Sequence, residues 1–473
     1  MSNGRQYSPK EDDLRKIHTA SMEILAKVGV VFHFNEAVDL FKKHGFKTEG
    51  LKVFIEESHV QNALSTCPEY FVWKGRDPEK AKAIGLSNYL LLPTYGPPFI
   101  IDTQGNQRRG TMEDYEKAVK LNHSSDVSEA MGFRYVAPDN ATLDTYLDML
   151  SMAINLSDKP LMGATDDGIA AADTMELMEI VYGKGALENN NLAVGLINPL
   201  SPLGYAGDMA HAIMVYSSHR QPLVIVNMIM AGMSGPIRIP NLLALMNAEL
   251  LAGIVLAQLN GPGTPIVYGT TSCPANLKTG LATVGNPETV KIASITMELA
   301  KFYHLPCRTG GSLTDSLLPD GQAMAEGTLA LTNAIRGGAN FILHAFGMLG
   351  GYIGLSFEKW IMDEELSRYI NCLMDSSQES FDDIDISEIA AMGSSGNYLY
   401  TEDTLKLCRK AFVPSKIFNK GDLALWQKEA KAGLFSKAQS EIEHRLKDYS
   451  YPQLEPSLQK DILSFISKKR RTF

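Results

Sequence analysis

The sequence predicts an α/β protein, a (β/α)8 TIM barrel with an N-terminal helical cap and a C-terminal helical appendage. The first observation is length, because 473 residues suit a barrel of roughly 250 to 400 residues with additions at both ends. The second is an alternation of short apolar runs with helix-like stretches through the middle of the chain. Parallel strands need such crossover connections, so the alternation predicts a parallel sheet linked by helices.

The N-terminal cap is expected over residues 1–85. Apolar residues recur near the helical period of about 3.6 between Leu14 and Leu25, which predicts a first helix. Two further amphipathic helices are expected at residues 35–44 and 57–66. The sequence pattern changes after this region, and the barrel is expected to begin there.

The barrel is expected over residues 86–375. Its eight predicted strands are the apolar runs Tyr89–Pro93, Ala130–Ala137, Pro160–Ala164, Leu192–Asn198, Leu223–Ala231, Pro265–Thr270, Pro306–Gly310 and Asn340–Phe346. Its eight predicted helices lie near residues 112–122, 143–156, 171–184, 206–218, 241–259, 287–303, 321–336 and 358–374. Eight repeats favour a closed barrel over an open doubly wound sheet. An inserted β-hairpin is expected near residues 99–110, around turn-forming residues.

The appendage is expected over residues 376–473. The Gly393–Asn397 stretch is typical of a loop, and two amphipathic helices are predicted at Leu423–Ala438 and Gln439–Leu446. The only basic run, Lys468–Arg471, is expected to be a solvated tail.

The charge balance of the chain argues against two classes of partner. The net charge is −10 and the pI is about 5.6, whereas nucleic acid and anionic lipid select a basic surface. The longest apolar run found, residues 222–233, is interrupted by Asn227 and Gly232, and residues 1–16 lack the apolar segment of a secretory signal. We therefore expect a cytoplasmic protein without nucleic-acid or membrane partners.

The cysteines indicate neither a disulfide framework nor a zinc site. Five of them, Cys67, Cys273, Cys307, Cys372 and Cys408, stand far apart in the chain. An odd and scattered set fits a reducing compartment, and no spacing typical of a zinc site is present.

The chemistry of a barrel lies at its mouth, by which we mean the C-terminal ends of the strands and the loops that follow. Here the mouth is rich in Met, Tyr and Phe, with few charges and one histidine, His344. Aromatic faces bind quaternary ammonium groups by cation–π attraction of about 0.5–2 kcal/mol per ring. The alternative is that these side chains pack the upper layer of the barrel. His344 is either a core histidine bonded to a backbone carbonyl or a donor in a substrate pocket.

Several motifs of this sequence resemble one known family. The longest block comprises Gly310–Ser316, Pro319–Asp320, Gly338–Ile342, His344–Ala345 and Gly347–Leu349. Shorter motifs are Gly29–Phe32, Tyr95–Phe99, Asn198–Pro199 and Gly285–Glu288. Together they resemble the trimethylamine methyltransferase family, over roughly residues 10–455.

The resemblance implies a corrinoid-dependent methyltransferase with a barrel fold. The founding members of the family carry pyrrolysine in the mouth and demethylate trimethylamine, whereas this sequence contains only the twenty ordinary residues. It therefore resembles the pyrrolysine-free branch, which demethylates glycine betaine, proline betaine, carnitine or γ-butyrobetaine. The sequence departs from many relatives at Gly396–Tyr398, where they have Gly-Gly-His.

On this basis the expected reaction moves a methyl group from a betaine, with glycine betaine or proline betaine favoured, to the Co(I) of a partner corrinoid protein in one-carbon metabolism. No tightly bound cofactor or metal is expected, no catalytic side chain is assigned, and the chain is expected to form a homo-oligomer. The residues expected to bind substrate are the rings of Tyr95, Phe346, Phe357 and Trp360 and the donors Asn198 and His344. The residues expected to dock the corrinoid protein are Met230, Met233, Asp315 and Met348.

Two other functions remain open at this point. A cofactor-independent lyase or aldolase-type barrel would need a lysine or paired carboxylates in the mouth, for which Asp166, Asp167 and Asp315 are the candidates. A betaine-binding homologue without catalysis would keep the pocket and lack methyl transfer.

Overall fold

The centre of the molecule is a parallel sheet of seven strands, in a computed structural model that describes residues 9–139, 141–374, 384–428 and 433–470. The strands lie in the order β6-β18-β17-β14-β12-β10-β9, and each neighbouring pair is parallel. Their bounds are β6 Leu90–Leu91, β9 Leu161–Met162, β10 Ala193–Ile197, β12 Leu223–Asn227, β14 Ile266–Thr270, β17 Cys307–Gly310 and β18 Phe341–Leu343. The predicted α/β class, with a parallel sheet, is confirmed.

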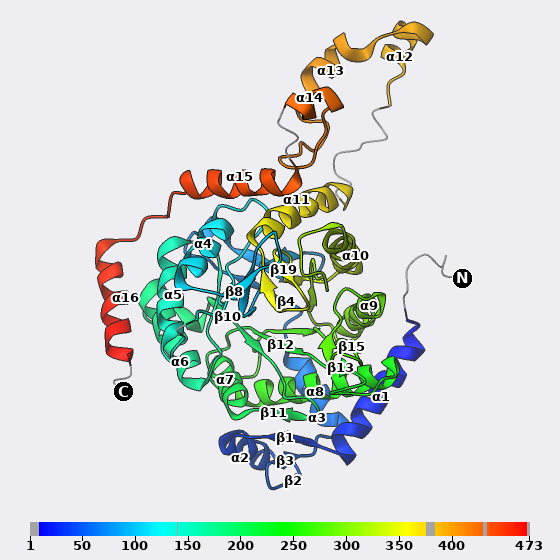
Figure 1. Cartoon of the computed structure of the whole chain (residues 1–473). Helices are drawn as coiled ribbons and strands as arrows, with labels where there is room; N and C mark the ends of the chain where they lie inside the picture. The colour runs from blue at the N-terminus through cyan, green and yellow to red at the C-terminus, as the bar shows by residue number, and fades with distance from the viewer. Residues whose placement is uncertain (1–8, 140, 375–383, 429–432, 471–473) are drawn as a thin grey trace.

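Eight helices surround this sheet, one at each predicted position (Figure 1). They are α4 Met112–His123, α5 Thr145–Leu156, α6 Gly168–Tyr182, α7 Gly207–Ser218, α8 Ile239–Asn260, α9 Pro287–Phe302, α10 Gly321–Gly337 and α11 Phe357–Met374. Several of these helices begin at a residue whose side chain caps the helix N-terminus. For example, the Asp167 and Asp320 side chains accept hydrogen bonds from backbone N–H groups in the first turns of α6 and α10.

The prediction of a strand at Ala130–Ala137 is wrong, because this segment has no regular ladder. Two of its carbonyl groups bind side chains of α4 instead of a neighbouring strand. The Asn122 amide donates to Ala130 O at 2.9 Å, and the Tyr115 hydroxyl donates to Phe133 O at 2.8 Å. Side-chain donors thus satisfy the backbone groups that a strand would have paired.

The same segment nevertheless contacts both edges of the seven-stranded sheet. The Glu129 N–H donates to Leu91 O in β6 at 3.3 Å. On the other side, Met131 N–H donates to Pro160 O at 2.7 Å, and Met162 N–H in β9 donates to Met131 O at 3.0 Å. The position of an eighth strand, between β6 and β9, is therefore occupied by a segment without regular secondary structure.

The N-terminal region contains the three expected helices and also a small sheet. The elements are α1 Glu11–Lys27, β1 Val30–Phe32, α2 Asn35–Lys43, β2 Thr48–Glu49, β3 Lys52–Val53, α3 Glu57–Thr66, β4 Tyr70–Trp73, the 3-10 helix η1 Pro78–Lys80 and β5 Lys82–Gly85. Strand β1 pairs with β3 and with β11 (Gly204–Tyr205), which follows β10 in the chain. This pairing attaches the N-terminal region to a loop of the mouth.

Further short strands build up the mouth. The predicted hairpin is present as β7 Phe99–Ile101 and β8 Gln107–Arg109, and β7 also pairs with β20 (Gly354–Leu355). Strand β20 forms its own hairpin with β19 (Met348–Leu349). A second small sheet contains β13 Met230–Ala231, β15 Cys273–Asn276 and β16 Leu281–Ala282. The 3-10 helix η2 (Ala186–Glu188) lies between α6 and β10.

The C-terminal region leaves the body and then returns to it (Figure 1). Its elements are α12 Ser387–Met392, η4 Gly393–Ser395, η5 Tyr398–Tyr400, α13 Glu402–Leu407, α14 Leu423–Lys428, α15 Leu434–Lys447 and α16 Pro456–Lys469. The predicted helix at Leu423–Ala438 spans α14 and the first turn of α15, and residues 429–432 between them lie outside the described residues. Helix α15 packs on α11 and α4, and α16 packs on α5 and α6.

The prediction of a solvated basic tail is wrong for the residues that the structure describes. The Lys469 ammonium lies 2.7 Å from Asp173 and 2.6 Å from Glu176, both on α6. Arg470 forms an ion pair with Asp148 on α5. Asp173 is almost fully buried, and burial of a carboxylate is unfavourable unless a cation pairs with it. Lys469 provides that cation.

Helix α8 is the most apolar of the long helices in the described residues. Sequence reasoning placed this helix but found the longest apolar run at residues 222–233 instead. Its composition and length would allow it to cross a membrane, but 94% of its most apolar window is buried inside the molecule. It carries one charged residue, Glu249, whose carboxylate accepts hydrogen bonds from Ser201, Leu203 and Asn227. This burial is typical of a core helix.

A buried ion pair joins α11 to the loops of the mouth. The Lys359 ammonium lies 2.7 Å from the Asp363 carboxylate, and both side chains are fully buried. Lys359 also donates to Ser312 O at 2.9 Å, after β17, and Asp363 accepts the Gly347 N–H at 2.8 Å, after β18. One pair of opposite charges thus fixes two loops that line the mouth.

We expect Lys359→Met to reduce the free energy of unfolding by about 3–5 kcal/mol, because Asp363 would remain buried without its cation. The double variant K359M/D363N should recover at least half of this loss, since asparagine is neutral and still accepts the Gly347 N–H. Denaturant unfolding measures both. Lys27→Met, which breaks an exposed ion pair with Glu23, is the control. Equal stability of K359M and wild type would contradict the role of the pair.

Candidate active site

Four polar side chains from separate strands and loops come together in the mouth. Tyr95 follows β6, Arg308 lies in β17, His344 follows β18, and Tyr352 lies between β19 and β20. Their association is shown by direct contacts. The Tyr95 N–H donates to His344 Nδ1 at 3.2 Å, and the His344 and Tyr352 rings meet edge to face at 5.0 Å. Arg308 is close enough to influence the pKa of both His344 and Tyr352.

Arg308 is a fully buried cation without a carboxylate partner among the residues that the structure describes. Its side chain is 1% exposed, and one terminal guanidinium nitrogen donates to Thr270 O at 2.9 Å. Its Nε has no hydrogen-bond partner. Burial lowers the pKa of Arg308 to about 10, so it remains protonated at neutral pH. An unpaired buried charge is costly, and the arrangement indicates a place for an anion.

His344 is held as a neutral donor. Burial, and then the charge of Arg308, hold its pKa well below the usual range. Because Nδ1 accepts the Tyr95 N–H, the proton of the neutral ring lies on Nε2. The backbone of His344 has φ +60°, which is rare outside glycine, and its N–H donates to Pro93 O at 3.1 Å. Such strain is typical of functional positions.

Tyr352 adds a second unsatisfied polar group. Its hydroxyl is buried and makes no hydrogen bond, although Thr271 lies nearby. Its backbone φ is +75°, so this residue too is held in a left-handed conformation. Burial raises the pKa of Tyr352 and of Tyr95 above their usual value, so both hydroxyls stay protonated. The site therefore offers donors without an available base.

An ion pair lies at the edge of this group. Arg134, in the irregular segment before α5, pairs with Asp166, which follows β9. Both residues influence the pKa of Tyr95, which places them near its ring. The charge of Asp166 is thereby balanced by Arg134.

Three of the six predicted substrate-binding residues lie at the mouth. Tyr95 and His344 are in direct contact with each other, and Asn198 is exposed at the end of β10. Sequence reasoning found these residues because it searched strand ends.

The other three predicted rings lie apart from this group of polar side chains. Phe346 and Trp360 are fully buried and stacked on each other with ring centres 6.2 Å apart, and the Trp360 indole N–H donates to Glu364. The Phe357 ring is occupied by the Lys117 ammonium, 4.1 Å from its centre. The face expected for a substrate cation is thus taken by a residue of the protein itself.

Only one of the four predicted docking residues is freely exposed. Met233 is 52% exposed, whereas Met230 is half-buried and Met348 is fully buried. The Asp315 carboxylate accepts the N–H groups of Val284 and Gly285 at 2.7 and 3.1 Å, so it fixes a neighbouring loop. Met348 and Asp315 therefore stabilise the loops of the mouth from inside and are not part of its exposed surface.

Sequence reasoning missed Arg308 and Tyr352. A signal for Arg308 was present, because a charge inside the predicted apolar strand Pro306–Gly310 is unusual in a buried sheet. Nothing in the sequence pattern pointed to Tyr352, because the β19–β20 hairpin brings it to the site.

The described residues hold no group of three or more His, Cys, Asp or Glu side chains suited to a metal ion. Two cysteines lie near the site, and burial raises the pKa of Cys273 and of Cys307 to about 12. Both are therefore neutral thiols at physiological pH and poor nucleophiles.

Comparisons with known proteins cover nearly the whole chain. Residues 5–473 match the family described as trimethylamine methyltransferase (MTTB). Glycine betaine methyltransferase of Desulfitobacterium hafniense (strain Y51) is 34% identical over 461 residues, 97% of this chain and 96% of that protein. Proline betaine:corrinoid methyltransferase of Eubacterium limosum is 32% identical over 494 residues, 96% and 95% of the two chains.

A solved structure supports the fold alone. The monomethylamine methyltransferase of Methanosarcina barkeri aligns with a TM-score of 0.52 over 94% of this chain and 89% of that one. The two sequences are 11% identical, so the likeness concerns the backbone arrangement.

We expect His344 to make stability depend on pH below about 6.5, the pKa of an unfolded histidine. The unfolded chain then binds a proton that folded His344 does not, so the free energy of unfolding falls as pH falls. His344→Asn removes this titration, keeps an acceptor for the Tyr95 N–H and suits the positive φ.

Denaturant unfolding between pH 5 and 7 should give a shallower slope for His344→Asn, by up to about 1.4 kcal/mol per pH unit. His304→Asn is the matched control, because His304 is exposed and also has a positive φ of 56°. Identical slopes for wild type and His344→Asn would show that His344 does not resist protonation.

Proposed function

Because the chain belongs to the trimethylamine methyltransferase family, whose members are corrinoid-dependent methyltransferases, we propose that it demethylates a betaine. The substrate is a quaternary amine with a carboxylate on a short linker, and the methyl group passes to the Co(I) of a partner corrinoid protein. The relatives named above for glycine betaine and proline betaine support this substrate class. The partner carries the corrinoid, so this chain needs no tightly bound cofactor of its own.

The observation that carries the proposal is the unpaired guanidinium of Arg308. A substrate carboxylate would supply the missing anion, and arginine binds carboxylates through two parallel hydrogen bonds. The Nε2–H of neutral His344 and the hydroxyl of Tyr352 are further donors beside it. Arg308, His344 and Tyr352 are thus three buried hydrogen-bond donors with no acidic residue among them, and such a group suits a carboxylate.

The quaternary nitrogen of the bound substrate would lie toward the Tyr95 ring and the open side of the mouth. Tyr95 is partly exposed, and its ring is the predicted aromatic face that remains available. Asn198, exposed at the end of β10, lies on the same side of the sheet and is retained as a polar neighbour. A carboxylate fixed by Arg308 would thus direct the methyl groups outward.

The site chemistry suits transfer from a quaternary amine. When the methyl group passes to the partner's Co(I), the C–N bond breaks and its electron pair stays on nitrogen. The tertiary amine leaves neutral, so no side chain has to donate a proton. Neutral His344, two protonated tyrosines and neutral thiols provide orientation and no acid–base catalysis, which is sufficient for an in-line transfer.

The corrinoid protein would dock on an apolar rim around the mouth. Five large apolar side chains in the loops after β12, β14 and β17 are 52–65% exposed: Met233, Ile237, Leu277, Leu281 and Leu317. Exposed apolar patches of this kind mark protein interfaces. Met230, Asp315 and Met348 support the rim from below.

We further propose that the sheet and the segment around Met131 form a closed (β/α)8 barrel, because this segment bonds both sheet edges. Residues 1–85, 86–375 and 376–473 are retained as the boundaries of cap, barrel and appendage. The acidic balance and the buried α8 support a cytoplasmic protein without nucleic-acid or membrane partners.

A lyase or aldolase-type reaction finds no support in the mouth. Asp166 is paired with Arg134, Asp315 holds two backbone N–H groups, and Asp167 caps α6. Lys359, on the first turns of α11, is paired with Asp363. No free lysine or pair of carboxylates is therefore available at these positions.

We expect methyl transfer to Co(I) from glycine betaine or proline betaine to exceed that from trimethylamine by at least about 100-fold, or about 2.8 kcal/mol. Trimethylamine would bury Arg308 and His344 without an anion, and it is mostly protonated at neutral pH. The absorption spectrum of the partner corrinoid follows the reaction. Carnitine and γ-butyrobetaine complete the series.

Choline is the matched control substrate, because it is quaternary and lacks the carboxylate. Comparable rates with choline and glycine betaine would refute the carboxylate site. Tight betaine binding without transfer to an active Co(I) partner would instead identify a betaine-binding homologue.

We expect Arg308→Met to weaken binding of the preferred betaine by about 1.5–3 kcal/mol, the usual value for a hydrogen bond to a charged group. The unliganded variant should be no less stable than wild type, because an unpaired buried charge has been removed. Calorimetric titration and thermal unfolding measure the two effects. Unchanged betaine affinity would exclude Arg308 from the site.

A further inference from the structure

The segment of residues 384–428, which we call the arm, stands clear of the rest of the molecule (Figure 1). It contains α12, α13 and α14, and none of these helices has a buried residue. Each is six residues long. Isolated helices of this length are not stable in water, so the arm needs a packing partner.

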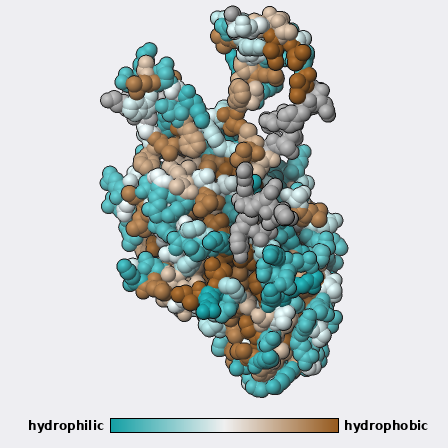
Figure 2. All heavy atoms as spheres, turned by 90° about the vertical axis from the view of Figure 1, so that its right-hand side faces the viewer, coloured by the Kyte–Doolittle hydropathy of each residue, from teal (hydrophilic) through white to brown (hydrophobic). Residues whose placement is uncertain are grey.

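The arm also exposes an unusual amount of apolar surface. Its exposed large apolar side chains are Ile384, Ile386, Ile389, Tyr398, Leu399, Tyr400, Leu405, Leu407, Phe412, Leu423 and Leu425. Phe412 is 81% exposed, the highest value among the large apolar residues. In Figure 2, where the arm stands above the body, hydrophobic residues are visible on its surface among more hydrophilic ones. A surface of this kind marks an interface.

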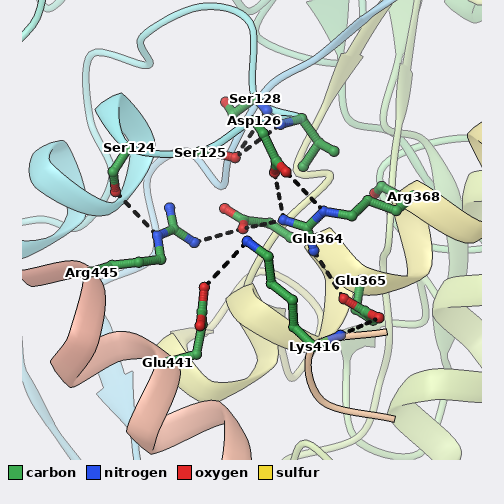
Figure 3. Close-up of polar contacts among 12 residues, drawn as sticks. Ser124, Ser125, Asp126, Ser128, Glu364, Glu365, Arg368, Lys416, Glu441 and Arg445 are labelled. Atoms are coloured by element: carbon green, nitrogen blue, oxygen red, sulfur yellow. Dashed lines mark hydrogen bonds and ion pairs between the residues drawn. The ribbon is translucent and has the colours of Figure 1, made fainter. Parts of the chain in front are cut away.

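The base of the arm is fixed to the body. Ile417 is 2% exposed, and the Phe418 ring packs edge to face on Tyr369 of α11 at 5.2 Å. The Lys416 N–H donates to Glu365, and its ammonium lies 3.5 Å from Glu441 of α15 (Figure 3). The arm is thus held at its base, and its outer part presents the apolar surface away from the body.

Buried ion pairs reinforce this base. Glu364 and Glu365 of α11 are 1% exposed, and they bind Arg445 at 2.7 Å and Arg368 at 3.0 Å respectively (Figure 3). Arg368 also pairs with Asp126 at 2.5 Å. The helices α11 and α15, on which the base of the arm packs, are therefore joined by a buried ion pair.

Charge is segregated along the arm, and one ion pair, Glu402–Lys406 at 2.5 Å, joins its two halves. Residues 384–405 carry four acidic side chains and no basic one: Asp385, Glu388, Glu402 and Asp403. Residues 406–428 carry six basic side chains and one acidic one: Lys406, Arg409, Lys410, Lys416, Lys420, Lys428 and Asp422. The acidic half includes α12 at the tip, and the basic half leads back to the base.

We propose that the arm binds the arm of a second copy of this chain, in an antiparallel and two-fold symmetric arrangement. Two identical arms placed antiparallel bring the acidic half of each against the basic half of the other. A two-fold interface requires such a self-complementary surface, whereas a different protein as partner does not. The apolar side chains of the two arms then cover each other.

Light scattering of the full-length chain alone, at micromolar concentration, tests the proposal. Wild type should be a dimer, and L405E/F412E should raise the dimer dissociation constant at least about 100-fold. Leu463→Glu is the matched control, since Leu463 is 56% exposed on α16, outside the arm, and its variant should remain a dimer.

A charge exchange tests the antiparallel arrangement. E388K/D403K makes the acidic half basic, and R409E/K410E reverses part of the basic half. Each variant should dimerise at least about tenfold more weakly than wild type. Their equimolar mixture should form the heterodimer, because opposite charges again face each other.

A monomeric wild type, or L405E/F412E with unchanged self-association, would overturn the proposal. It would also be overturned if the arm variants lost binding of the corrinoid protein while their self-association was unchanged, which would assign the arm to that partner. Failure of the heterodimer to form would overturn the antiparallel arrangement. Betaine affinity of the variants is independent of these results, so they do not bear on the proposed reaction.

Discussion

The burial of one positive charge without a carboxylate partner governs the candidate site. Burial lowers the pKa of Arg308 only to about 10, so it stays protonated, and one of its terminal nitrogens donates a hydrogen bond to Thr270 O. Burial, reinforced by that charge, lowers the pKa of His344 and keeps it neutral, and the Tyr95 N–H fixes its tautomer. The loops that follow Arg308 and His344 in the chain are held in turn by the Lys359–Asp363 pair, which binds Ser312 and Gly347. This arrangement is the basis for proposing that the site binds a carboxylate.

Much of the fold could be predicted from the sequence because its helices are long and periodic. All eight helices predicted between residues 112 and 374 and the hairpin at residues 99–110 lie where the pattern placed them. The strand expected at Ala130–Ala137 is absent because Asn122 and Tyr115 bind its carbonyl groups. Such side-chain bonds depend on tertiary contact and leave no trace in hydrophobic periodicity. The helix α8 was predicted, but its apolar character was underestimated because Glu249 and the asparagines interrupt it.

The candidate site was predicted less completely, for a geometric reason. The strand-end rule found Tyr95 and His344, yet it also selected Phe346, two residues after His344. In a regular strand these two side chains would share a face. The backbone instead turns at His344 and again at Gly347, both with positive φ, so Phe346 points into the helical layer and packs on Trp360. Arg308 was missed because it lies inside β17, whereas the search covered the ends of strands and the loops after them.

The ion pairs made by α15 and α16 make the helical layer depend on residues far away in the sequence. Glu364 and Asp173 are buried carboxylates in the body, and they pair with Arg445 of α15 and Lys469 of α16. Without α15, Glu364 would keep the Arg368 guanidinium at 3.5 Å, whereas without α16, Asp173 would lose the Lys469 ammonium and keep the Tyr146 hydroxyl. A truncation that removes α16 therefore leaves a buried carboxylate without its cation, so the two helices are part of the electrostatic balance of the layer on which they pack.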